Sequence, residues 1–158
     1  MTGPRTGSAL LYDRFTKNTI RILMNAHAEA ETLGRYDVGC EQLFIALLKE
    51  TRGLYTNILT SAGLTLEETR RVVAEMSEID TTVDRTRGTA TQIIFSRDAE
   101  KCLELAWGEA QRLGVDQIEP EHILLALLAT DSKSLAYLWS QLRVNRLKFK
   151  EHVFKLIS

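Results

Sequence analysis

Two glutamates, Glu41 and Glu121, stand at equivalent positions near the start of two apolar segments that are predicted to be helices. A carboxylate in the first turn of a helix stabilises that helix through its dipole, which is the structural interpretation. The functional interpretation is a cleft in which each glutamate binds a cationic group. The free N–H groups and the hydroxyl at the start of a nearby helix, at Thr16 or Ser96, would then accept an anion.

Enzymatic signatures are absent from the sequence. No phosphate-binding glycine loop, zinc-protease motif, nucleophile elbow or EF-hand loop occurs, so no nucleotide hydrolysis, cofactor or metal is predicted. An enzyme would need Cys40, Glu41, Glu121 and His122 to converge in one pocket, and this is the weakest hypothesis. We therefore expect a protein that is not an enzyme.

The remaining reactive side chains are predicted to be structural. Cys40 and Cys102 form no C-x-x-C pair, and small buried cysteines are the common case. A helix start could also lower the thiol pKa of Cys40. His27 and His152 lie on predicted helices without paired ligands, so we expect them to pack or to face solvent.

Composition favours a helical domain that does not span a membrane. The chain has 158 residues, 44% of them hydrophobic and 26% charged, and leucine and alanine far outnumber valine and isoleucine. The longest apolar run, 123–129, is too short to cross a membrane. A formal net charge of −1, balanced between the two halves, argues against nucleic-acid binding. The two cysteines favour a reducing compartment.

The chain contains an internal repeat at an offset of 80 residues. Shifting 15–76 onto 95–156 gives 12 identities in 62 pairs without a gap, and they gather at helix faces and helix ends. Phe15 pairs with Phe95 in this way. We predict a single domain, 1–158, made of repeat one (15–76), a connector (77–94) and repeat two (95–158).

Each repeat is predicted to form four helices, which gives an all-α fold of about eight helices in two pseudo-twofold-related units. Hydroxyl N-caps and glycine stops bound the first helices, and the apolar second helices should be central and buried. In repeat one the predicted helices run from Thr16 to Gly34, from Cys40 onward, over about 53–62, and from Thr65 onward, the last with a capping box closed by Glu68. In repeat two they run from Ser96 to Gly114, from Pro120 onward, over about 133–142, and from Asn145 onward.

Two further patterns carry expectations. Trp107 and Trp139 are predicted to anchor the core, because large aromatic side chains dominate core packing. The last helix is locally basic, and its cations either face solvent or dock a partner or phosphate. These cations are Arg143, Arg146, Lys148, Lys150 and Lys155.

The repeated strings resemble the double Clp N-terminal domain of Clp-family AAA+ unfoldases, especially the ClpC and ClpA branch. They are the Phe-Thr or Phe-Ser starts at 15–16 and 95–96, the Leu-Gly turns at 33–34 and 113–114, and the segments 38–43, 46–48 and 118–128. The similarity spans about 12–157. It implies a module that docks adaptors and substrate degrons for a hexameric unfoldase and its ClpP-type protease.

In ClpC-like members each repeat can hold a phosphorylated arginine, with the glutamate against the guanidinium. By position the resemblance assigns Thr16 with Glu41, and Ser96 with Glu121. This sequence departs from the family pattern, since the threonine before each glutamate is Cys40 or Pro120. The family's histidine is also glutamine in the first repeat. These changes remove donors from any phosphate cradle.

The sequence is compatible with several functions. The leading hypothesis is a non-enzymatic interaction module of the Clp system that binds adaptors, substrates or Clp subunits, in the cytoplasm. The alternative is a free-standing assembly factor that stabilises the ClpP-type core, similar to plastid ClpT proteins, in the plastid stroma. The end at Ser158 and the divergent signature favour a free-standing protein over an unfoldase fragment. A helix-turn-helix DNA-binding protein is a further alternative, and the balanced charge of the chain argues against it.

Overall fold

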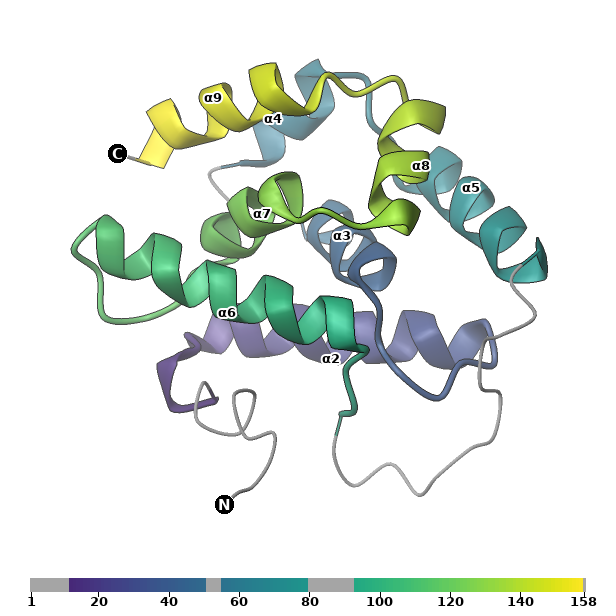
Figure 1. Cartoon of the computed structure of the whole chain (residues 1–158), viewed down its shortest axis with the longest axis horizontal. Helices are drawn as coiled ribbons and strands as arrows, with labels where there is room; N and C mark the ends of the chain where they lie inside the picture. The colour runs from purple at the N-terminus through teal and green to yellow at the C-terminus, as the bar shows by residue number, and fades with distance from the viewer. Residues whose placement is uncertain (1–11, 51–54, 80–92, 158) are drawn as a thin grey trace.

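The computed structural model describes residues 12–50, 55–79 and 93–157 (Figure 1). Within these ranges the chain forms eight α-helices, one short 3₁₀ turn at Tyr12–Arg14, and no strand beyond two isolated bridges. The predicted all-α fold is confirmed. The helices are α2 (Lys17–Thr32), α3 (Cys40–Lys49), α4 (Thr56–Ser61), α5 (Leu66–Ile79), α6 (Arg97–Arg112), α7 (Pro120–Ala129), α8 (Lys133–Gln141) and α9 (Arg146–Ile157).

The first helix of each repeat starts at the predicted hydroxyl. Thr16 Oγ1 accepts the Thr19 N–H at 3.2 Å, and Ser96 Oγ accepts the Ala99 N–H at 3.1 Å. Both side chains thereby satisfy a backbone donor that the helix leaves open. The predicted stops are confirmed as well, because Gly34 and the equivalent glycine of the second repeat have φ of 73° and 77°.

The second helices, α3 and α7, lie at the centre of the molecule and contact each other (Figure 1). α2 packs along α3, and α6 packs along α7. The side chains at 43–47 and 122–128 are buried, as the nearly continuous apolar sequence of these helices predicts. The two four-helix units therefore share one core.

Two short parallel bridges cross between the repeats. Phe15 pairs with Ile118, and Val38 pairs with Phe95. The shift of 80 residues exchanges one bridge for the other, so they obey the pseudo-twofold relation. The Ser96 N–H donates to the Val38 carbonyl at 2.8 Å. Each repeat thus anchors the start of its first helix on the other repeat.

Two predicted boundaries and one predicted capping box need correction. α5 continues to Ile79, so helix extends into the predicted connector, and 80–92 lie outside the described residues. α4 begins at Thr56 rather than near 53, while 51–54 are not described. Only half of the predicted capping box forms: Thr65 Oγ1 accepts the Glu68 N–H at 3.1 Å, but the Glu68 carboxylate pairs with Arg71.

The two tryptophans differ in their surroundings. Trp139 is buried and meets Phe44 edge to face, with 4.9 Å between ring centroids, which confirms its predicted role in the core. Trp107 is only partly buried, and the Arg14 guanidinium lies 4.4 Å from its ring centroid. Trp107 therefore closes the edge of the core rather than filling its centre.

Candidate protein-binding sites

The start of α2 lies against the segment that leads into α7. Thr16 Oγ1 donates to Glu119 Oε1 at 3.2 Å, and Thr19 Oγ1 donates to the Ile118 carbonyl at 2.7 Å. The bridges place the start of α6 against the segment that leads into α3 in the same way. Each hydroxyl start therefore faces the second helix of the other repeat, whereas the resemblance paired hydroxyl and glutamate within one repeat.

Glu41, at the start of α3, is buried and has partners within the chain. Its Oε2 lies 3.5 Å from Arg35 Nη1, and its Oε1 accepts the Ser134 hydroxyl at 3.3 Å. Arg35 also pairs with Asp37 at 2.9 Å. A cationic group of a ligand would have to compete with this internal guanidinium for the Glu41 carboxylate.

Gly39, just before α3, leaves the space that Glu41 occupies. A Cβ at Gly39 would lie 3.1 Å from Glu41 Oε1 and 3.0 Å from Gln42 Oε1, which is too close for an ordinary contact. The second repeat carries Glu119 at the equivalent position. The two helix starts are therefore chemically different despite their common backbone arrangement.

Glu121, in the first turn of α7, is half-buried. Burial raises the pKa of its carboxyl above the ordinary value, and the nearby negative charge of Glu119 adds to this effect. Two carboxylates thus stand at the start of α7, and one of them bonds to Thr16. This negative charge opposes binding of a phosphate at the start of α2.

Gln42 and His122 perform the same task in the two repeats. Gln42 Oε1 accepts the Gly39 N–H at 2.8 Å, and His122 Nδ1 accepts the Glu119 N–H at 2.8 Å. Burial lowers the pKa of His122, which favours the neutral ring that this bond requires. The signal for this role was available in the sequence, because both residues occupy the third helical position after the N-cap.

Cys40 and Cys102 are both buried, as predicted. The neighbouring Cys102 side chain of the other repeat, together with burial, raises the pKa of the Cys40 thiol far above its ordinary value. The thiolate form needed for nucleophilic attack is therefore disfavoured. The possible lowering of this pKa by the helix start is overruled.

The described residues form neither a cluster of metal ligands nor a membrane-spanning helix. No three histidine, cysteine, aspartate or glutamate side chains in these parts of the chain come together as a metal ion would require. None of the described helices combines the length and the apolar character needed to cross a bilayer.

Comparison with known proteins identifies the family. The family described as the Clp repeat N-terminal domain matches residues 14–142. The chain belongs to the Clp N-terminal domain family. It is 32% identical over 149 residues to an ATP-dependent Clp protease ATP-binding subunit ClpA homolog from Guillardia theta, and 31% identical to the chloroplastic chaperone protein ClpC of Pisum sativum. In each case 94% of this chain is covered, but only 18% and 16% of the relative.

Solved Clp N-domains share the fold. The N-terminal domain of the chaperone ClpD from Arabidopsis thaliana matches with a TM-score of 0.78, 23% identity, and coverage of 92% of this chain and 95% of that one. A ClpV N-domain in complex with a VipB peptide matches with a TM-score of 0.69, 21% identity, and coverage of 99% and 96%. Both likenesses concern the fold.

Proposed function

We propose that this chain is a non-enzymatic protein-interaction module of the Clp chaperone-protease system, which binds adaptors, substrates or Clp subunits. The observation that carries the proposal is the double Clp repeat, in which reciprocal bridges hold each first-helix start against the other repeat. The solved complex of a ClpV N-domain with a peptide supports the same kind of activity for this fold. One domain with repeats at 15–76 and 95–158 is part of the proposal.

The proposal excludes catalysis because the enzymatic candidates have structural partners. The raised pKa of the Cys40 thiol beside Cys102 favours its protonated form, and His122 uses a ring nitrogen to cap α7. Glu41 pairs with Arg35 and accepts the Ser134 hydroxyl, so its carboxylate has partners within the chain.

The proposed binding residues are Thr16, Glu41, Ser96 and Glu121, at the four helix starts that meet in two pairs across the repeats. The partner is a Clp unfoldase, its adaptor or substrate, or the ClpP-type core. The second candidate, an assembly factor for that core, shares this surface. The proposed compartment is the cytoplasm or the plastid stroma, and relatives named as chloroplastic favour the stroma.

Affinity capture tests the proposal. The tagged chain should recover Clp subunits or adaptors from a lysate, and the double variant Glu41→Gln/Glu121→Gln should recover about fivefold less, because it loses both negative charges. Glu104→Gln and Glu151→Gln, both at exposed positions, are the matched controls. Recovery of no Clp component by the unmodified chain at micromolar concentration would refute it.

Native mass spectrometry with purified ClpP-type subunits separates the two candidate functions. An assembly factor should raise the concentration of intact ring at a given subunit concentration. A receptor for adaptors or substrates should leave the ring unchanged.

A further inference from the structure

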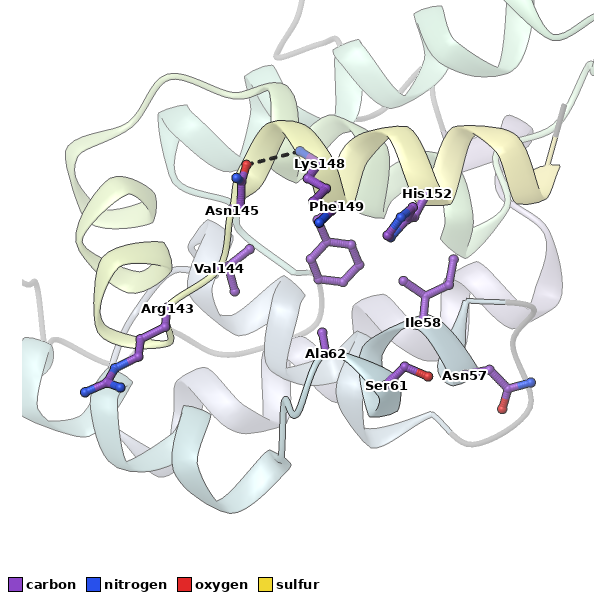
Figure 2. A pocket seen from close by; sticks show the side chains of 10 residues that line it. All are labelled: Asn57, Ile58, Ser61, Ala62, Arg143, Val144, Asn145, Lys148, Phe149 and His152. Atoms are coloured by element: carbon purple, nitrogen blue, oxygen red, sulfur yellow. Dashed lines mark hydrogen bonds between the residues drawn. The ribbon is translucent and has the colours of Figure 1, made fainter.

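A groove of about 440 Å³ lies between α4 of the first repeat and α9 of the second (Figure 2). Phe149 and His152 extend from α9 toward α4, and Ile58 and Ala62 lie opposite. The volume falls in the range of sites that enclose a ligand. Arg143, Val144 and Lys148 also line the groove.

The pseudo-twofold counterpart of this groove lies between α8 and α5. There α5 packs directly on α8, which is nine residues long, whereas α4 has only six. The positions of Ser61 and Ala62 are taken by Gln141 and Leu142 in the second repeat. Ile58, which is partly buried, corresponds to the fully buried Leu138. We attribute the open groove to the small side chains of Ser61 and Ala62 at the end of α4.

The groove has a cationic border. Lys148 contributes positive charge and His152 an imidazole, and Arg143 stands at the α8 end, where its guanidinium extends away from Phe149 and Ile58 (Figure 2). Among the described residues that line the groove none is an aspartate or a glutamate. The position of Lys148 is taken by Glu68 in the first repeat. The basic character thus belongs to this groove and is not repeated at its counterpart.

Arg143 has a strained backbone conformation. Its φ is 59°, in the left-handed region, and the equivalent Gly63 has a φ of 79°. Among the described residues, every other positive φ belongs to a glycine. A non-glycine residue in this conformation costs about 1 kcal/mol. The backbone conformation of this arginine, at the α8 end of the groove, is an outlier of the kind found at functional sites.

We propose that the α4–α9 groove binds an acidic segment of a partner protein that carries large apolar side chains. The apolar side chains would pack on Ile58, Val144 and Phe149, and the carboxylates would meet Arg143 and Lys148 at the border. This deepens the proposed function, on which it rests for the class of partner. A second copy of the chain is a poorer occupant, since it would bring another cationic groove.

Fluorescence anisotropy tests the groove with two labelled peptides. One has two leucines separated and flanked by glutamates, and the other has lysine in place of every glutamate. The acidic peptide should bind about tenfold or more tightly than the basic one. Ala62→Leu, which installs the side chain of the second repeat, and Lys148→Glu should each weaken acidic-peptide binding about tenfold. Ala28→Leu and Lys101→Glu, at exposed positions on other helices, are the matched controls.

Arg143→Gly adds a readout that a purely structural role would not produce. It should raise the melting temperature, because strain is removed, and at the same time weaken binding of the acidic peptide. Equal binding of both peptides, unchanged affinity in Ala62→Leu and Lys148→Glu, or dimerisation through the groove in place of peptide binding would each overturn the inference.

Recovery of Clp components from a lysate by the tagged chain and by Ala62→Leu tests this inference separately from the proposed function. If the unmodified chain and Ala62→Leu recover Clp components equally, the proposed function stands and the groove is refuted as the docking site. If the acidic peptide binds in the groove but no Clp component is recovered, the proposed function fails and the groove remains a peptide site.

Discussion

His122 Nδ1 accepts the Glu119 backbone N–H at 2.8 Å and thereby caps α7 with a titratable ring. Gln42 makes the equivalent bond to Gly39 with an amide that does not titrate. One of the two central helices is thus held by a pH-sensitive bond, and its pseudo-twofold mate is not.

Acidification should destabilise the protein through His122. Its pKa in the folded state lies below the ordinary value of 6.5, mainly because of burial, although Glu119 and Glu109 raise it in part. The unfolded state therefore binds more protons as the pH falls below about 6.5, and the free energy of unfolding decreases. Urea unfolding at about pH 7.5 and pH 5 measures this loss.

His122→Gln should keep the cap and remove this part of the pH dependence. Its free energy of unfolding should match the unmodified chain near pH 7.5 within about 1 kcal/mol, the worth of one hydrogen bond, and exceed it near pH 5. The exposed His152→Gln is the control substitution. An identical profile for His122→Gln and the unmodified chain would contradict the argument.

Cys40 and Cys102 should be inert in the folded protein. Both are buried, and the raised pKa of Cys40 beside Cys102 disfavours its thiolate. We expect a thiol-disulfide reagent to modify the native chain about 100-fold more slowly than the urea-unfolded chain, because reaction requires opening of the core. Comparable rates in the two states would show that the pair is accessible.

Arg35 and Glu41 should be energetically coupled. Both side chains are largely buried at 13% and 11% exposure, with 3.5 Å between Nη1 and Oε2. A double-mutant cycle with Arg35→Gln and Glu41→Gln should give a coupling of about 1 kcal/mol in the free energy of unfolding. The pair Arg71 and Glu68, about half exposed, is the control and should couple less. Equal coupling in both pairs would remove the structural role assigned to Arg35.

Glu119 should suppress anion binding at the start of α2. Its carboxylate accepts the Thr16 hydroxyl at 3.2 Å, where an anion would otherwise lie. Glu119→Gly keeps a residue suited to the N-cap and should raise the affinity for phosphoarginine about fivefold, the effect of removing a unit charge at roughly 4 Å in water. Isothermal titration calorimetry measures this change.

The control for this prediction is Thr16→Val in the Glu119→Gly background. It should cancel the gain, because the hydroxyl that would donate to the phosphate is gone. A gain that persists without the hydroxyl, or no gain from Glu119→Gly, would show that this helix start is not an anion site.

Much of the fold was predictable from short-range signals. Thr16 and Ser96 cap backbone N–H groups only three residues away, and Gly34 ends a helix through its own backbone conformation. The repeat at 80 residues showed that two such units exist. The predicted ligand residues Thr16, Glu41, Ser96 and Glu121 were placed at helix starts correctly, and their binding role remains a prediction.

The sequence by itself determined the eight helices, the hydroxyl caps of α2 and α6 and the apolar faces, because these depend on neighbours within about four residues. Only the tertiary structure decided which helix start meets which glutamate. The bridges from Phe15 to Ile118 and from Val38 to Phe95 cross between repeats, and no local pattern encodes that exchange. The α4–α9 groove arises in the same way, since its size depends on side chains that are distant in the chain and meet only after the repeats pack together.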